Sequence, residues 1–364
     1  MKILMQARIN LLTAPGGDTV QILKTKEYLE NLGIEVDLCI EISNNFNYEK
    51  YDIVHLFNVT RIQETYWFAK MAKNANKKVV LSTIFWDNTE VEKKADIGFR
   101  SIINKYLSLN QIEYLKTLGR LVIQKEFNQS TFQLLRKGFR GLQKETIEYV
   151  DFFLPNAEIE MDMFHSFFSP QKRLPYEVIP NAVTVQDSPD NGFEEFKDCI
   201  LCVGRIDPRK NQLNLVRALK HTNYKVVFVG QPAPNHADYM NKIKKEATKN
   251  MYFLGWMDNS KISILYKQAR VHVCPSWYET PGLASLEAAA LGCNIVVTEP
   301  GSTREYFENM AFYCEPDSIQ SILNSVEKAF NSPISKDLQN RVLTNYTWQE
   351  AAKKTLDVYK KLNN

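Results

Sequence analysis

The sequence contains no long apolar run, which limits how the chain can meet a membrane. No stretch reaches the length of about 18 apolar residues that a spanning helix needs. Residues 1–12 hold one Lys and a short apolar patch that Gln6, Arg8 and Asn10 interrupt, and no cleavage-like pair of small residues follows. We therefore expect a first strand instead of a signal peptide, and a cytoplasmic location, with peripheral contact at the inner face of the membrane as a second possibility.

The sequence also lacks a strong excess of either charge. The formal net charge is +3 over 364 residues, and 44% of the residues are hydrophobic. Nucleic-acid-binding domains usually carry a marked excess of Lys and Arg, so bulk charge gives no argument for a nucleic acid partner. The length and the hydrophobic content predict two ordinary globular domains.

Metal-ligating patterns are missing. The chain has six scattered cysteines, of which only Cys199 and Cys202 have CxxC spacing, and these lie in an apolar run with no second pair. We interpret them as buried, reduced thiols of a cytoplasmic protein. The five His residues show no ligand spacing and no Asp-x-Asp pair occurs, so we expect no catalytic metal and no other cofactor. His272 alternates within an apolar run and is expected in the core, whereas His55 could be buried or could face a cleft.

The order of the predicted elements indicates an α/β fold with two doubly wound units. Short apolar runs alternate with stretches of helical periodicity in both halves, which is typical of parallel sheets covered on both faces. The polar segment 184–196 contains Pro and Gly and is predicted to be a linker. The runs that we expect to form strands are 2–9, 34–42, 52–59, 77–85 and 149–156 before the linker, and 199–206, 224–230, 251–256, 270–276 and 294–301 after it.

From these elements we expect an N-terminal domain at 1–184, a C-terminal domain at 198–345 and a final amphipathic helix at 346–364. Two such units would place a ligand cleft between them, at the carboxyl ends of the strands.

A basic helical insert interrupts the first series at about 91–150. Between residues 92 and 145 there are eleven Lys and Arg against five acids, a local net charge of +6, with Leu, Ile and Phe interleaved. Two interpretations stay open. The insert could meet anionic lipid head groups or a lipid-linked acceptor, or it could be a solvated helical face over an ordinary core.

The densest group of candidate site residues is PSWYETPGLASLEAAALG, at 275–292. Pro281 makes one continuous helix from Glu279 to Glu287 unfavourable, so we expect Glu279 in a loop and Glu287 early in the helix that follows. The free N–H groups of Gly282, Leu283 and Ala284 would then form an anion-binding site at the helix start. The alternative is a plain strand–turn–helix with two solvated acids.

Two further segments could bind phosphate. In VGRIDPRKNQ a strand ends near Gly204, and Arg205 and Lys210 follow it, as would suit a diphosphate; the alternative is a polar loop with exposed bases. In APGGD, Gly16 and Gly17 would let the backbone approach a phosphate closely, although this turn matches no standard phosphate-binding motif.

Together these segments resemble the retaining glycosyltransferases of family four. The resemblance rests on Glu-x7-Glu, formed by Glu279 and Glu287, and on VGRIDPRKN, VIPNAV, FLGWMDNSKISILY, TEPGSTREYF and YTWQEAAKK. It is continuous in the C-terminal half and limited to the Gly-Gly turn and the strand order in the N-terminal half. It implies the GT-B fold, with two Rossmann-like domains facing a central cleft and a C-terminal helix that packs back towards the N-terminal domain.

The resemblance also implies roles for individual residues. Glu279 would bind hydroxyls of the donor sugar, and Glu287 the ribose hydroxyls. Arg205 and Lys210 would neutralise the departing diphosphate. Further donor-binding groups would be the amides of Gly282, Leu283, Ala284 and Gly17, and the loop at Gly255 and Trp256, near the base.

Two departures from the family pattern affect the site. Pro281 stands where the family often has Phe. STIFWDN offers Phe85, Trp86 and Asp87 where the family often has a His near the sugar, so Asp87 is the substitute candidate, with Gly16 and His55 as other candidates for the first-domain wall.

The resulting hypothesis is a metal-independent, retaining hexosyltransferase. It would move a sugar from a nucleoside diphosphate sugar to a carbohydrate or lipid-linked acceptor, in the assembly of bacterial-type surface polysaccharide or glycolipid. The alternatives are a sugar-nucleotide epimerase, a relative of glycogen phosphorylase, and an inactive partner subunit that binds the donor.

Overall fold

The chain divides into two compact units. Unit 1 comprises 1–87, 104–181 and 348–364, and unit 2 comprises 88–103 and 182–347. The structure is a computed structural model, and it describes residues 1–43, 46–59, 61–87, 111–112, 114–115, 118–119, 129–170, 173–185, 189, 191–233, 236–280 and 282–363.

Unit 1 is built on a five-stranded parallel sheet with the order β2-β1-β3-β4-β5. Strand β2 pairs with one edge of β1 and strand β3 with the opposite edge. The strand order therefore reverses between β1 and β3. The central strands are buried along most of their length because both faces of the sheet are covered, as the sequence predicts. The strands are β1 (Lys2–Gln6), β2 (Glu35–Cys39), β3 (Ile53–Phe57), β4 (Lys78–Ser82) and β5 (Phe152–Phe153).

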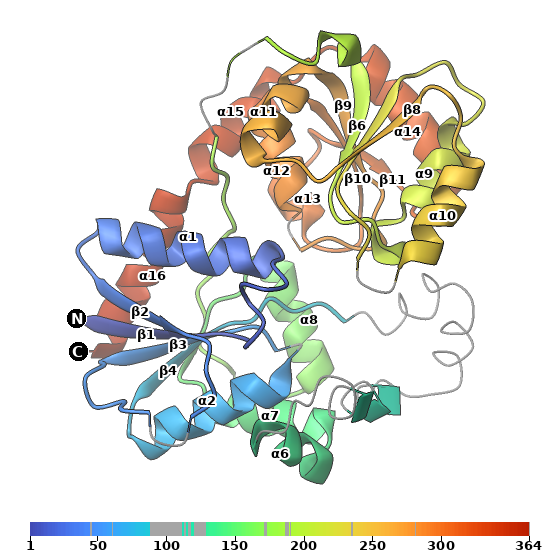
Figure 1. The fold of residues 1–364 in the computed structure, drawn as a ribbon. Helices are drawn as coiled ribbons and strands as arrows, with labels where there is room; N and C mark the ends of the chain where they lie inside the picture. Colours follow the sequence, from blue (N-terminus) through green and yellow to red (C-terminus); the bar gives the residue numbers. More distant parts are fainter. Residues whose placement is uncertain are drawn as a thin grey trace. The chain divides into compact units, whose positions relative to one another are not determined.

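The helices of unit 1 lie on both faces of this sheet. Figure 1 shows α1 and α2 on opposite sides of it, with α6 and α7 beyond α2. They are α1 (Gly17–Asn31), α2 (Ile62–Asn74), α6 (Gln129–Lys137), α7 (Phe139–Tyr149), α8 (Glu158–Phe168) and α16 (Trp348–Asn363).

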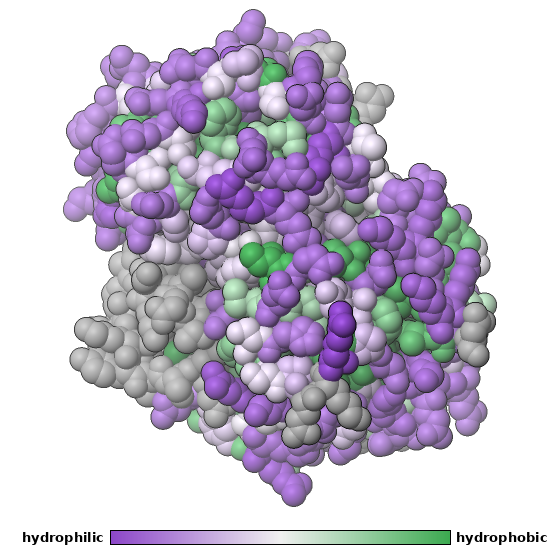
Figure 2. All heavy atoms as spheres, turned by 180° about the vertical axis from the view of Figure 1, so that it is seen from behind, coloured by the Kyte–Doolittle hydropathy of each residue, from purple (hydrophilic) through white to green (hydrophobic). Residues whose placement is uncertain are grey.

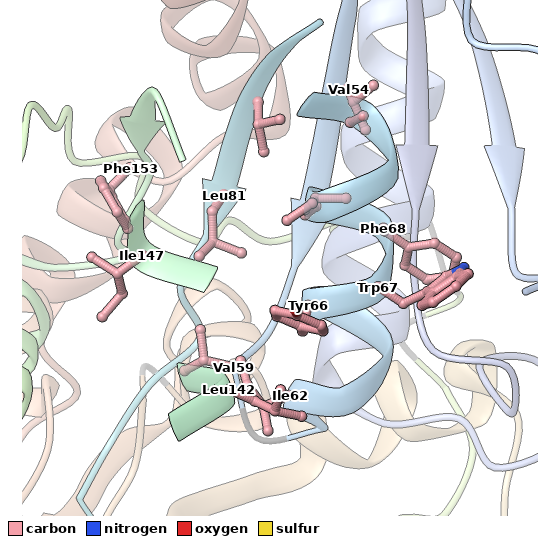
Figure 3. Close-up of a cluster of buried hydrophobic side chains, with 14 of the residues drawn as sticks. Val54, Val59, Ile62, Tyr66, Trp67, Phe68, Leu81, Leu142, Ile147 and Phe153 are labelled. Carbon is pink, nitrogen blue, oxygen red and sulfur yellow. The ribbon is translucent and has the colours of Figure 1, made fainter. Parts of the chain in front are cut away.

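Helix α2 is the centre of the core of unit 1, because it packs on β3 and β4 with one side and on α6 and α7 with the other. Tyr66 and Phe68 of α2, Leu81 of β4 and Leu142 of α7 are almost completely buried in one cluster (Figure 3). Each large apolar side chain buried in this way stabilises the fold by about 1.5–3 kcal/mol relative to an exposed one. The basic insert thus contributes α7 to the core, while most of its residues 91–128 lie outside the described residues.

The C-terminal helix α16 belongs to unit 1, where it packs against α1 as the family resemblance implies. A buried hydrogen-bond chain links it to the sheet. Nδ1 of His55 in β3 lies 2.6 Å from the Tyr359 hydroxyl of α16, and Nε2 lies 2.9 Å from the Ser82 hydroxyl at the end of β4. His55 is 1% exposed, and burial lowers its pKa to about 3, so the ring is neutral at pH 7.

The placement of His55 on a cleft wall is therefore wrong. His55 is the third of five residues in β3, and both ring nitrogens are engaged inside unit 1. Its side chain points into the packed interior instead of lying at the carboxyl edge of the sheet.

Unit 2 is built on a six-stranded parallel sheet with the order β11-β10-β9-β6-β7-β8. The chain runs from β6 through β7 to β8 on one side, and then returns to pair β9 with the other edge of β6. The strand order therefore reverses between β6 and β9. The strands are β6 (Cys199–Val203), β7 (Val226–Val229), β8 (Met251–Gly255), β9 (Ala269–Cys274), β10 (Asn294–Thr298) and β11 (Phe312–Cys314).

Helices cover both faces of this sheet too. Figure 1 shows α9, α10 and α14 on one side and α11, α12 and α15 on the other. The helical segments are η1 (Glu194–Phe196), η2 (Pro208–Lys210), α9 (Gln212–Leu219), α10 (Ala237–Glu246), α11 (Asn259–Gln268), α12 (Leu283–Ala290), α13 (Thr303–Phe307), α14 (Ile319–Asn331) and α15 (Lys336–Asn345).

Apolar residues are mostly interior in both units. In the view of Figure 2, hydrophilic residues cover most of the described surface, with hydrophobic ones in separate patches. Cys199, Cys202 and His272 are buried, as expected from the sequence. Within the described part of the chain, none of the helices has both the length and the apolar character needed to cross a membrane.

Replacing Tyr359 with Phe should weaken the attachment of α16 to the sheet. The change removes a buried hydroxyl and leaves a ring nitrogen of His55 without its partner, which should cost about 1–3 kcal/mol. Urea unfolding measures the loss. Tyr252→Phe is the matched control, since Tyr252 is 38% exposed. Equal losses in the two variants would contradict the importance of this hydrogen-bond chain.

Candidate functional site

The candidate site lies where the strand order of unit 2 reverses. Strands β6 and β9 are parallel neighbours, so the loops that follow them diverge from the same edge of the sheet. In open α/β sheets such a point commonly forms a ligand site. The loop after β6 holds Arg205 and Lys210, and the loop after β9 leads to Glu279.

The loop after β6 is shaped by Asp207, which is not among the site residues predicted from the sequence. Asp207 caps η2 by accepting a hydrogen bond from the Lys210 amide at 3.1 Å. Its other carboxylate oxygen accepts a hydrogen bond from Nε of Arg205 at 3.1 Å. An Asp followed by Pro at the first helical position is a sequence pattern that could have identified this cap. Asp207 therefore fixes the backbone that carries Lys210 and orients the side chain of Arg205, which is 53% exposed.

Lys210 and Glu279 form the central contact of the site. Nζ of Lys210 lies 2.6 Å from Oε1 of Glu279, and the two side chains are only 17% and 6% exposed. Nη1 of Arg209 lies 3.6 Å from the same oxygen. Burial alone would raise the pKa of Glu279, but Lys210 and Arg209 lower it to about 2. Glu279 is therefore ionised at neutral pH, and the sequence did not show that it pairs with Lys210.

Gly301, in the loop after β10, holds the backbone of Glu279. The Glu279 amide donates a hydrogen bond to the Pro300 carbonyl at 3.2 Å, and the Ser302 amide donates to the Glu279 carbonyl at 2.8 Å. Gly301 has φ +110°, and a Cβ there would lie 1.9 Å from the Glu279 carbonyl oxygen. Only glycine fits at this position. Gly301 lies in the segment TEPGSTREYF, but its sequence does not indicate this close backbone contact.

Gly230 has the corresponding role for the loop after β6. It follows β7 with φ +139°, and a Cβ there would lie 2.0 Å from the Gly204 carbonyl oxygen. Its amide donates a hydrogen bond to the Gly255 carbonyl at 2.7 Å. The ends of β6, β7 and β8 are thus in close backbone contact. Trp256, directly after Gly255, is 65% exposed at this edge.

Helix α12 begins at Leu283, after Gly282 in a left-handed conformation, with φ +77°. The amides of Ser285 and Leu286 donate to the Gly282 carbonyl. Within the described residues, the amides of Leu283 and Ala284 donate to no backbone acceptor. This agrees with the predicted helix start, although the position of Pro281 lies outside the described residues.

Glu287 is the fifth residue of α12, so the division into a loop acid and a helix acid is confirmed. The hydroxyl of the buried Tyr266 donates a 3.5 Å hydrogen bond to Oε2 of Glu287. Burial raises the pKa of Glu287 to about 7, and this hydrogen bond lowers it only in part. The two acids of the Glu-x7-Glu motif therefore have opposite environments, which their sequence spacing could not reveal.

The Gly-Gly turn of unit 1 is held by Arg8. Its guanidinium donates hydrogen bonds to both carboxylate oxygens of Asp18, at 2.6 and 3.0 Å, and to the Ala14 carbonyl at 2.9 Å. Gly16 caps α1, and Gly17 is its first residue. The Asp18 carboxylate accepts a hydrogen bond from the Thr19 amide. An anion at this helix start would therefore meet an acid that is already paired, and the phosphate role of Gly17 stays a prediction.

The segment after β4 provides the other first-domain candidate. The amide of Phe85 and the hydroxyl of Thr83 both donate hydrogen bonds to the buried Glu160 of α8, which fixes this segment against α8. The Phe85 ring packs on Phe164. Asp87, two residues further, is partly exposed, and its role at the site stays a prediction. Across the described ranges, no three His, Cys, Asp or Glu side chains gather in a way that could hold a metal ion.

Comparisons with known proteins place the C-terminal half in one family. Residues 185–347 match the profile of "Glycosyl transferases group 1". An uncharacterized glycosyltransferase of Methanocaldococcus jannaschii is 31% identical over 182 residues, which are 46% of each chain. The GPI3 subunit of the phosphatidylinositol N-acetylglucosaminyltransferase of Saccharomyces cerevisiae is 28% identical over 50% of this chain and 44% of its own length. The chain thus spans less than half the length of these relatives.

Solved structures match over the whole chain. Sucrose-phosphate synthase from Thermosynechococcus elongatus has a TM-score of 0.71 at 16% identity, covering 100% of this chain and 99% of its own. The Anabaena protein HepE in complex with UDP-glucose has a TM-score of 0.69 at 15% identity, covering 99% of this chain and all of its own. At these identities the similarity shows the fold, and the predicted GT-B architecture is confirmed.

Replacing Gly301 with Ala should disrupt the site by displacing the backbone of Glu279. The new Cβ would overlap the Glu279 carbonyl oxygen, so we expect a loss of at least about 3 kcal/mol in unfolding free energy. Gly33→Ala is the matched control, because Gly33 also has positive φ, at +81°, but no atom lies within 4 Å of its Cβ position. That control should lose only about 1–2 kcal/mol. Similar losses in denaturant titrations would argue against a steric role for Gly301.

The raised pKa of Glu287 should appear in the pH dependence of stability. A carboxyl whose pKa rises on folding binds its proton more tightly in the folded state, so its contribution to stability is present below about pH 4.5 and is lost as the pH rises to about 7. Glu287→Gln should flatten the thermal-stability profile over this interval. Calorimetry of both proteins measures the difference, and parallel profiles would mean that Glu287 ionises without penalty.

Proposed function

We propose that the protein is a retaining glycosyltransferase. Residues 185–347 match the group 1 glycosyltransferases, and the whole chain has the GT-B fold. It transfers a sugar from a nucleoside diphosphate sugar to a hydroxyl of an acceptor. The observation that carries the proposal is the convergence of Arg205, Lys210 and Glu279 where the strand order of unit 2 reverses.

The cations of this site suit a diphosphate leaving group. Negative charge grows on the phosphate as the bond to the sugar breaks, and fixed cations near it are more effective in the transition state than in the ground state. Arg205 is half exposed, and its Nε donates to Asp207, which leaves its two terminal nitrogens for a ligand in this proposal. Lys210 is within reach of the same ligand from the adjoining η2 turn. In this proposal the chemistry needs no metal ion.

The acids of the site suit the hydroxyl groups of the donor. Glu279 is ionised and accepts hydrogen bonds, so it binds hydroxyls of the sugar, while α12 offers the amides of Leu283 and Ala284 to the phosphate. Glu287 accepts hydrogen bonds from the ribose hydroxyls. Trp256 offers an exposed ring beside the edge of the sheet on which the base can stack.

The proposal also extends to the base of the donor and to the class of the acceptor. A UDP-sugar is the first donor to test, because HepE, which shares the fold, was solved with UDP-glucose. For the acceptor we propose a carbohydrate or a lipid-linked glycan. The support is an exposed surface on α6 and α7, where Phe132 is 66% exposed and Arg136, Arg140 and Lys144 are also exposed. An apolar tip among cations suits an anionic lipid surface.

The other functions predict different behaviour with a sugar nucleotide. An epimerase converts it to another sugar nucleotide without an acceptor. An inactive partner subunit binds nucleoside diphosphate tightly and shows no turnover with any acceptor. A phosphorylase relative requires inorganic phosphate. Incubation with and without acceptors, followed by analysis of the released nucleotide, separates these outcomes.

The test of the proposed function combines binding with mutation. UDP, ADP and GDP and their glucose derivatives are compared by thermal shift, since a ligand that binds only the folded state stabilises it. With the donor found in this way, Arg205→Ala should lower kcat by about 10²–10³-fold, as removal of one charge-stabilising donor does elsewhere. Arg304→Ala is the control, because its partner is the exposed Glu299. Full activity of Arg205→Ala and of Lys210→Ala would rule out this use of the site.

A further inference from the structure

Arg209 is a charged residue of the site to which the proposed reaction assigns no role. It lies in η2 beside Lys210, and its Nη1 is 3.6 Å from Oε1 of Glu279. Glu279 therefore has two cations on one oxygen, with Lys210 at 2.6 Å as the nearer one. One cation would be enough to pair a single carboxylate, so the second calls for a physical explanation.

The two cations differ in how firmly they are held. The guanidinium of Arg209 lies 5.1 Å from the centre of the Tyr278 ring, and Nη1 donates a 3.3 Å hydrogen bond to the Tyr278 carbonyl. The Arg209 carbonyl accepts a hydrogen bond from the Trp277 amide at 2.9 Å. The side chain and the backbone carbonyl of Arg209 are thus both hydrogen-bonded to the loop of Glu279. Lys210 is a point charge on a flexible stem. Within the described residues, its Nζ donates a hydrogen bond only to Glu279.

This difference has a consequence when a diphosphate binds. A diphosphate competes with Glu279 for the ammonium group of Lys210. A buried carboxylate that loses its only counter-ion is strongly destabilised, or takes up a proton. Glu279 can release Lys210 at low cost only if another cation stays beside it.

We propose that Arg209 is a positioning residue that stays with Glu279 as its second counter-ion and so allows Lys210 to move to the diphosphate of the donor. This inference rests on the proposed function and assigns a division of labour within the same site. Arg205 and Lys210 act on the phosphate. Arg209 acts through Glu279, which it keeps ionised and oriented towards the sugar.

The first experiment needs no ligand and therefore tests Arg209 independently of the proposed function. The unfolding equilibrium is measured for Arg209→Gln in the wild-type protein and in Lys210→Met. With Lys210 absent, Arg209 is the remaining counter-ion, so Arg209→Gln should shift the equilibrium by about tenfold more than it does in the wild type. The extra shift should vanish when Glu279→Gln is added. Equal shifts with and without Lys210 would overturn the proposal.

A variant that does not fold still gives a result. If Lys210→Met with Arg209→Gln is unfolded, recovery of the fold on adding Glu279→Gln supports the proposal, because the uncompensated carboxylate is then the cause. Failure of that triple variant to fold would point to a packing role for Arg209 and would overturn the proposal. Arg217→Gln is the matched control, since Arg217 pairs with Glu246 at 2.7 Å away from Glu279.

The second experiment uses UDP as the probe. In Arg209→Gln, release of Lys210 obliges Glu279 to take up a proton, so UDP affinity should fall with rising pH by up to about tenfold per pH unit. The wild type and Arg209→Lys should lack this slope, and in Glu279→Gln the change at Arg209 should not alter UDP affinity. Parallel pH profiles would contradict the proposal. If the wild type binds no nucleoside diphosphate while the first experiment succeeds, it is the proposed function that fails, and Arg209 remains the second counter-ion of Glu279.

Discussion

The ion pair between Lys210 and Glu279 is the interaction on which the arrangement of the site depends. It joins the loops that follow β6 and β9. These strands are neighbours in the sheet but far apart in the sequence, since Cys199 of β6 pairs with Ala269 of β9. A buried carboxylate needs a cation close by, so each loop can keep its position only while the other keeps its own. Together with the hydrogen bonds of Arg209 to Trp277 and Tyr278, the contact couples the geometry of the two loops.

This coupling explains why glycine stands at the ends of the flanking strands. Gly230 brings the end of β7 against the Gly204 carbonyl, and Gly301 brings the loop after β10 against the Glu279 carbonyl. Any side chain at either glycine would displace the backbone that carries one partner of the ion pair. The polar centre of the site is thus set by backbone contacts on both sides of it, and these contacts leave no room for adjustment.

The sequence predicted the elements better than their contacts. Apolar runs and helical periodicity gave the two parallel sheets, and the position of Glu287 within a helix followed from Pro281. The pairing of Lys210 with Glu279 could not be predicted, because it depends on β9 returning beside β6. His55 shows the same limit, since alternation along a strand does not say which residue of a distant helix will meet it. Here the partner is Tyr359, at the other end of the chain.

The two acids of the Glu-x7-Glu motif show how one loop and one helix can provide different chemistry. Glu279 is buried and Glu287 is partly buried, and burial by itself raises the pKa of a carboxyl. Glu279 has two cations, and its pKa falls to about 2. Among the described residues, the hydrogen-bond partner of Glu287 is the Tyr266 hydroxyl, and the pKa of Glu287 rises to about 7. Glu279 is therefore a permanent negative charge that fixes its surroundings. Glu287 can gain or lose a proton near neutral pH, so a ligand that donates hydrogen bonds to it must also favour its ionised form. The motif thus combines a rigid acceptor with one whose charge depends on what is bound.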